Sequence, residues 1–174
     1  MDEGIIKIRK AILTDAKGIA KVHVDSWKTT YVNIVPDEYL NKLSYESREQ
    51  MWANAIPSGG VYVAENNEGL IVGFSKGGKE RSGNYDGYDG ELYAIYILKE
   101  YQGRGIGTAL VKPVIDELKG MGSTSMVVLV LEENTSCKFY ELLGGKKIDT
   151  VEVEIGGKKL SELVYGWNDI RNIF

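Results

Sequence analysis

Three glycines stand at alternate positions in the second half of the chain, at Gly103, Gly105 and Gly107. An apolar segment precedes them and an amphipathic segment follows, which predicts a strand passing into a helix. Because glycine lacks Cβ, such a turn lets an anion approach main-chain N–H groups, and the helix start offers unpaired amides and a positive dipole end. Gln102 and Arg104 add a hydrogen-bonding group and a cation. We therefore predict a diphosphate site here; a tight corner without a ligand is the alternative interpretation.

Two other reactive groups occur once each. Cys137 is the only cysteine and His23 the only histidine, so neither an intrachain disulfide nor a thiolate-based metal site is expected. With no base assignable beside it, Cys137 is expected to be a packed or inert thiol. His23 could border a pocket, but a structural or surface role is the better hypothesis. We predict no metal.

The elements that must position these residues follow from hydrophobic periodicity and turn signals. The first half is expected to fold into strand, helix, helix, strand and strand, over residues 5–11, 15–27, 36–55, 60–65 and 70–76. The second half predicts strand, helix, strand, helix and a final hairpin, over residues 91–98, 107–119, 124–131, 134–143, 147–155 and 158–167. Residues 77–90, rich in Gly, Asn and Asp, are expected to form a plain loop, since the acids lack EF-hand spacing.

This order, βααβββαβαββ, predicts an α/β fold within one domain, residues 1–174. The strand over 91–98, the helix after the glycines and the apolar strand over 124–131 form a strand–helix–strand unit with parallel strands. We expect a single mixed, mostly antiparallel sheet of about seven strands, flanked by about four helices. Alternation along 91–98 puts Glu91, Tyr93, Ile95 and Ile97 on one face.

Composition excludes several classes of protein. The chain has 174 residues, 43% of them hydrophobic, and a net charge of −4, so it is expected to fold alone and not to bind nucleic acid or anionic membranes generally. No signal peptide and no apolar run of membrane-spanning length is recognised. We expect a protein of the reducing cytoplasm, either a monomer or a homodimer.

The segment from Gln102 to Gly107, Gln-x-x-Gly-x-Gly after a strand and opening a helix, resembles the signature of the GNAT superfamily of acyl-CoA-dependent N-acetyltransferases. Residues 132–145, with Asn134 and Tyr140, resemble the family's second conserved stretch. The order of elements is also similar to the GNAT fold, so the resemblance covers nearly the whole chain. Lys99, where the family often has proline, and Gly145, where it often has an aromatic residue, depart from the pattern.

The resemblance implies a cofactor, acetyl-CoA, as acyl donor. Main-chain groups of Ile95, Tyr96 and Ile97 would line the pantetheine arm, and Asn134 would bond to it. The pyrophosphate would lie against residues 102–108, which are Gln102, Gly103, Arg104, Gly105, Ile106, Gly107 and Thr108.

Transfer of an acetyl group to an amine needs two proton transfers. An amine with a pKa of about 10 must lose a proton before it attacks, and Glu91 is our candidate base, directly or through a water. A solvated charge at the start of a strand is the alternative for Glu91. The departing thiolate benefits from a proton, and the resemblance places the hydroxyl of Tyr140 at the coenzyme sulfur; a core aromatic is the alternative. A strand amide near Ile97 would meet the oxyanion.

The acceptor pocket is the least constrained prediction. Connectors beside a rigid sheet usually carry specificity, so we expect Trp27, Tyr31, Tyr39 and Tyr93, together with the loop over residues 77–90, to contact a small-molecule or peptide amine.

Two other functions stay open. One is an acyl-CoA sensor that transfers nothing. The other is a dinucleotide-binding oxidoreductase, although Gly103, Gly105 and Gly107 give G-x-G-x-G rather than G-x-G-x-x-G and little chain remains for further parallel units.

Overall fold

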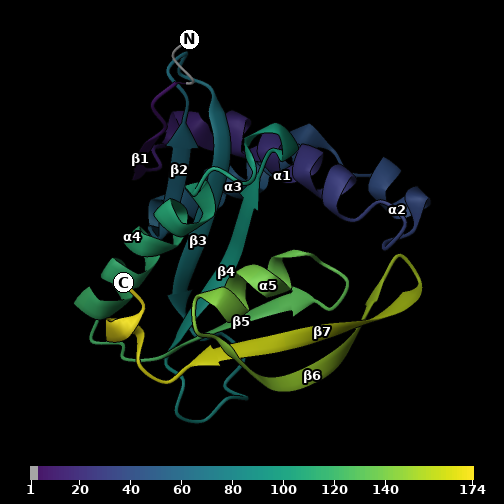
Figure 1. The fold of residues 1–174 in the computed structure, drawn as a ribbon. Coiled ribbons are helices and arrows are strands. Elements are labelled where there is room, and N and C mark those ends of the chain that lie inside the picture. Colours follow the sequence, from purple (N-terminus) through teal and green to yellow (C-terminus); the bar gives the residue numbers. More distant parts are fainter. Residues whose placement is uncertain (1–3) are drawn as a thin grey trace.

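A computed structural model describes residues 4–174, which build one seven-stranded sheet in the order β1-β2-β3-β4-β5-β7-β6 (Figure 1). The strands are β1 (Lys7–Lys10), β2 (Val61–Glu65), β3 (Ile71–Lys79), β4 (Gly90–Ile97), β5 (Met126–Leu131), β6 (Lys146–Ile155) and β7 (Lys158–Trp167). Only β4 and β5 are parallel; the other neighbouring pairs are antiparallel. The predicted mixed, mostly antiparallel sheet is therefore confirmed, and one parallel pair is too few for a dinucleotide-binding fold.

Five α-helices lie within residues 4–174: α1 (Ala16–Thr30), α2 (Asp37–Asn41), α3 (Tyr45–Ala55), α4 (Ile106–Gly120) and α5 (Ser136–Leu142). The helix predicted over 36–55 is in fact two, because Ser44 has an extended backbone and its hydroxyl caps α3 by accepting from Ser47 N (3.2 Å). Helix α1 also continues past Trp27 to Thr30. None of these helices is long and apolar enough to cross a bilayer.

Helices cover both faces of the sheet (Figure 1). On one face, α1 and α3 bury Ile19, Val22 and Trp52 against strand residues such as Phe74. On the other face, α4 buries an apolar stripe against β4 and β5, which consists of Val111, Val114, Ile115 and Leu118. These stripes recur at helical spacing, so burial of one face fixes the orientation of each helix.

A bulge in β4 changes which side chains share a face. Leu92 pairs with Gly77 and Ala94 with Lys76, so Tyr93 is skipped in the register with β3. Leu92 packs under α4 with the main core, and Ile95 packs against that same core, whereas Ala94 packs on the α1 side. The prediction that Glu91, Tyr93, Ile95 and Ile97 share one face is therefore wrong, because the inserted residue reverses the alternation.

Strands β4 and β5 separate soon after they meet. Their parallel pairing runs only from Gly90↔Met126 to Leu92↔Val128, although β4 continues to Ile97 and β5 to Leu131. The carboxyl ends of the two strands therefore diverge, and this opening in the middle of the sheet places the candidate site.

Candidate active site

The entrance of helix α4 exposes main-chain amides. Gly103 and Gly105 have φ of 75° and 80°, left-handed values that favour glycine. The first hydrogen bond of the helix joins Ala109 N to Gly105 O (3.2 Å), so the amides of residues 106–108 have no partner within the helix. A Cβ at Gly107 would lie 3.2 Å from the ring of Phe139, so this glycine also lets α4 and α5 approach closely. Together these features could hold an anion.

The edge of β4 offers further main-chain groups. Leu98 N donates to Val72 O (2.9 Å), and hydrogen-bonded pairs alternate along an antiparallel ladder. The main-chain groups of Tyr96 therefore point toward β3, so the prediction that they face a pantetheine arm is wrong for this residue. The main-chain groups of Ile95 and Ile97 point toward the opening. Gln102 Nε2 donates to Ile97 O (3.1 Å), which ties the glycine loop to this edge.

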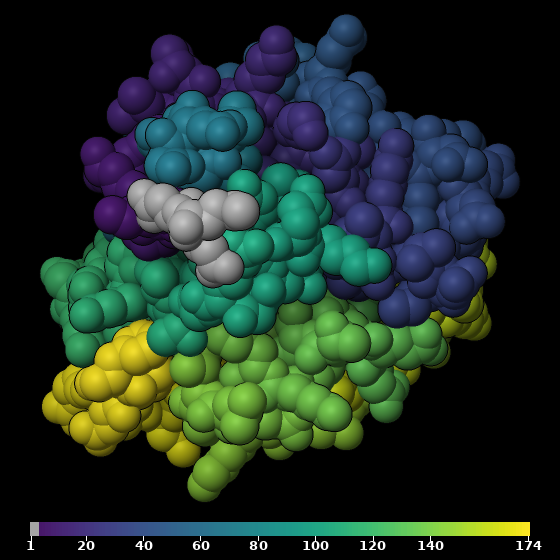
Figure 2. All heavy atoms as spheres, turned by 45° about the horizontal axis from the view of Figure 1, so that its top comes forward, coloured from purple at the N-terminus to yellow at the C-terminus, as the bar shows by residue number. Residues whose placement is uncertain are grey.

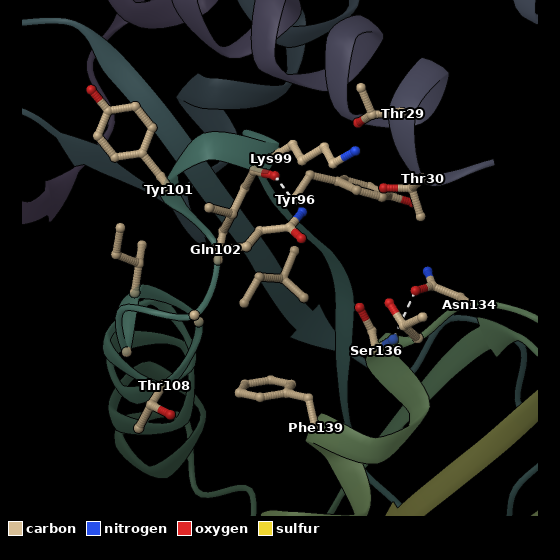
Figure 3. A pocket seen from close by; sticks show the side chains of 17 residues that line it. Thr29, Thr30, Tyr96, Lys99, Tyr101, Gln102, Thr108, Asn134, Ser136 and Phe139 are labelled. Carbon is tan, nitrogen blue, oxygen red and sulfur yellow. Dashed lines mark hydrogen bonds between the residues drawn. The ribbon is translucent and has the colours of Figure 1, made fainter. Parts of the chain in front are cut away.

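A first cavity of about 510 Å³ joins these two features. In Figure 2 the teal chain around residue 100 lies between the purple and blue N-terminal helices and the light green segment of α5. Figure 3 shows β4, the glycine loop, α5 and the end of α1 surrounding the cavity, with Gln102 pointing inward. The predicted cofactor residues that line it are Ile95, Tyr96, Ile97, Gln102, Gly103, Gly105, Ile106, Gly107, Thr108 and Asn134.

Two predicted cofactor residues lie elsewhere. Arg104 does not line the cavity; its guanidinium lies 5.1 Å from the ring centroid of Tyr101. Tyr140 lines a second cavity. The glycine turn, the free amides and the edge of β4 that faces away from β3 nevertheless fit a diphosphate joined to an extended arm, because all three border the same cavity.

The second cavity, about 240 Å³, lies beside the first, and the two share Ile95, Tyr96, Asn134 and Ser136. It contains the predicted residues Glu91, Trp27, Tyr31, Tyr93 and Tyr140. Tyr39 lines neither cavity; its ring packs 6.2 Å from that of Trp27. A ligand that fills the first cavity would therefore present one end to a second cavity lined by both aromatic and aliphatic residues.

A chain of hydrogen bonds links residues that line the two cavities. The buried amide of Asn134 donates to Tyr31 Oη (3.0 Å), while its Oδ1 accepts from Ser136 N (2.8 Å). Tyr31 Oη lies 3.5 Å from Tyr96 Oη. Asn134 thus fixes the start of α5 and a wall of the second cavity, and its contact with a pantetheine arm stays a prediction.

Tyr140 brings a protonated hydroxyl to the second cavity. Its side chain is 4% exposed and packs among Phe139, Tyr165 and Trp167. Burial, with smaller contributions from Tyr31 and Cys137, raises the pKa of the phenol well above its usual value. Among residues 4–174 its hydroxyl has no hydrogen-bond partner, so the proton is available to a ligand.

Glu91 is buried rather than solvated, being 3% exposed. Its carboxylate accepts from Arg81 N (3.1 Å) and from Arg81 Nη2 (2.7 Å). The Arg81 guanidinium also stacks 3.9 Å above the ring centroid of Tyr93. The carboxylate of Glu91 is therefore already engaged by Arg81, and its role as a base stays a prediction.

The thiol of Cys137 is unsuited to act as a nucleophile. Burial raises the pKa of the Cys137 thiol, and its Sγ donates to Leu131 O (3.6 Å), so the unreactive protonated form is favoured. Within the described part of the chain, no group of three His, Cys, Asp or Glu side chains is arranged to hold a metal.

His23 is a structural residue behind the second cavity. Its Nδ1 accepts from Trp52 Nε1 (3.1 Å), and its ring stacks on Tyr96 with centroids 5.7 Å apart. Burial first, and the charge of Arg48 second, lower its pKa to about 4.

We expect this histidine to make stability depend on pH. The unfolded chain, with a histidine pKa near 6.5, binds more protons than the folded one between pH 6.5 and about 4. The free energy of unfolding should therefore fall as pH falls through this window, by at most about 3 kcal/mol. Urea unfolding of the wild type and of His23→Gln at pH 7 and 4.5 measures this, and an equal fall in both proteins would contradict the assignment.

Several lining residues were not predicted. Thr29, Thr30, Lys99 and Tyr101 reach the first cavity, as do Ser136 and Phe139. Glu162 reaches the second, which Arg81 also lines from the loop over 77–90 that was expected to border the acceptor pocket. For Glu162 a signal existed: within Leu160–Val164 it is the acid that alternates with two apolar residues on one face of a strand.

Comparisons with known proteins agree with this geometry. The sequence profile described as "Acetyltransferase (GNAT) family" matches residues 23–144. The chain is 43% identical over 166 residues to the uncharacterized N-acetyltransferase YuaI of Bacillus subtilis (strain 168), covering 95% of each protein.

Solved structures share the fold at low identity. The paia N-acetyltransferase from Thermoplasma acidophilum, in complex with coenzyme A, superposes with a TM-score of 0.72 at 24% identity, covering 91% of this chain and 98% of that one. The yncA protein from Salmonella typhimurium, with its cofactor acetyl-CoA, gives a TM-score of 0.69 at 22% identity, covering 94% and 93%.

Proposed function

The chain belongs to the GNAT family of acetyltransferases, and on that premise we propose that it transfers an acetyl group from acetyl-CoA directly to a primary amine, within a ternary complex. The observation that carries the proposal is the pair of adjoining cavities. The first offers donors to a diphosphate and an extended arm. The second contains Tyr140, whose protonated phenol can donate to a ligand.

In this proposal, cofactor binding, oxyanion stabilisation and protonation of the leaving sulfur are each assigned to particular groups of the chain. Amides at the entrance of α4 hold the diphosphate, and the exposed edge of β4 holds the pantetheine arm and the thioester carbonyl, with an amide near Ile97 facing the developing oxyanion. The amine enters the second cavity and attacks the carbonyl carbon. Tyr140 donates its proton to the departing sulfur. The amine can belong to a small molecule, a peptide or a protein.

Two measurements test this function. Calorimetry should show saturable binding of acetyl-CoA and no comparable binding of NADH. Release of free coenzyme A in the presence of an amine panel should then exceed release without amine. Binding without amine-dependent release across the panel would favour an acyl-CoA sensor, and absence of binding would refute the proposal. A single domain over residues 1–174, the cytoplasm, and a monomer or homodimer stay predictions.

A further inference from the structure

The second cavity contains one carboxylate whose charge is not compensated. Its charged side chains are Arg81, Glu91 and Glu162. Arg81 and Glu91 form an ion pair, with 2.7 Å between Nη2 and Oε2. The Glu162 side chain forms no ion pair and no hydrogen bond within residues 4–174. The cavity therefore has one net negative charge, located at Glu162.

The strand positions explain how Glu162 comes to face the cavity. On β7 it lies opposite Leu131 of β5 and Val151 of β6. Its neighbour two residues earlier, Leu160, packs with Tyr31 and Leu131 on the same side as the cavity. The Glu162 side chain is half-buried. A carboxylate in such a place, without a partner, is costly unless a cation joins it.

The protonation properties of Glu162 suit a base. Burial, and then the nearby charge of Glu91, raise its pKa above the ordinary value. A carboxylate with a raised pKa accepts a proton more readily at neutral pH. Glu91, in comparison, is already engaged, because Arg81 donates hydrogen bonds to both of its carboxylate oxygens.

The other residues of the second cavity limit the size and chemistry of the acceptor that can enter it. Aromatic residues, among them Trp27, Tyr31 and Tyr93, line it together with aliphatic residues of β5. Such rings attract an ammonium group and pack against an apolar body. The volume of about 240 Å³ lies below the range of about 300–1,000 Å³ typical of sites for drug-sized ligands, so the part of an acceptor that enters must be small.

On the basis of the proposed function, we infer that the acceptor is a small primary amine with a single positive charge and no acidic group, and that Glu162 binds its ammonium and takes its first proton. The nitrogen lone pair then forms the C–N bond as the C–S bond breaks. Tyr140 gives its proton to the sulfur and regains one from the nitrogen, so coenzyme A leaves as the thiol. Glu162 releases its proton to solvent.

Tyramine and tyrosine provide a matched pair of probes, because they differ only by a carboxylate. For the wild-type protein we expect kcat/KM for tyramine to exceed that for tyrosine by at least about tenfold, since an acid would meet Glu162. Glu162→Gln should lower kcat/KM for tyramine by about 100-fold or more. The same substitution should also reduce the ratio of kcat/KM for tyramine to kcat/KM for tyrosine. The affinity for acetyl-CoA, measured by calorimetry, should change by less than about twofold.

The controls separate this inference from the proposed function. Glu154→Gln, an exposed acid on the same hairpin, should match the wild type. If acetyl-CoA binds but neither tyramine nor n-butylamine releases coenzyme A, the assigned class of acceptor is wrong. Equal activity of Glu162→Gln and wild type, or a loss seen in Glu91→Gln and absent in Glu162→Gln, would overturn the role of Glu162. If the wild-type protein does not bind acetyl-CoA in calorimetry, the proposed function itself is refuted.

Discussion

Replacing Tyr140 with phenylalanine is expected to lower kcat by about 100- to 1,000-fold, because the departing thiolate loses its proton donor. The dissociation constant for acetyl-CoA should change by less than about twofold, since Tyr140 lines the second cavity and not the first. Steady-state kinetics with the best amine from the coenzyme A release screen, together with calorimetry, would measure both quantities. The ring itself stays in place, so packing among Phe139, Tyr165 and Trp167 is kept.

Tyr165→Phe is the matched control for this experiment. Tyr165 is also buried, its ring centroid lies 6.1 Å from that of Tyr140, and it lines neither cavity. Removal of its hydroxyl should leave turnover within about twofold of the wild type. An unchanged kcat in Tyr140→Phe would remove this phenol from the mechanism, and an equal loss in both variants would indicate a packing effect.

The sequence predicted best those features that depend only on residues close together in the chain. The glycine loop and the helix after it depend on neighbouring residues, and the first cavity indeed contains Gln102, Gly103 and Gly105. The order of strands and helices followed from periodicity, because each element buries one face. The split of the helix over 36–55 was also visible in principle, since Ser44 is a typical helix cap.

Long-range features could not be predicted in this way. The bulge at Tyr93 depends on how β4 pairs with β3, and it brings Leu92 and Ile95, three positions apart, to the same core. The partner of Glu91 is Arg81, which lies in the segment predicted as a plain loop. Glu162 reaches the second cavity because β7 inserts between β5 and β6, an order that local patterns do not specify.

Substitution of Gly105 by valine is expected to weaken acetyl-CoA binding by about 100-fold or more, which corresponds to about 2.7 kcal/mol. Gly105 has φ of 80°, where a side chain with Cβ costs about 1–2 kcal/mol. A Cβ at this position meets no protein atom within 4 Å, so it would project from the glycine turn beside the proposed diphosphate. The turn would therefore lose both its conformation and its open approach to the amides of α4.

Gly69→Val is the control that distinguishes backbone strain at a positive φ from loss of the proposed diphosphate site. Gly69 has φ of 83°, has no protein atom within 4 Å of a built Cβ, and lies in the turn between β2 and β3, so the backbone cost is similar. Both variants should lose comparable free energy of unfolding in urea, but only Gly105→Val should lose affinity in calorimetry. If the two variants bind acetyl-CoA equally well, the diphosphate does not lie at the entrance of α4, and the positive φ of Gly105 serves only to turn the chain.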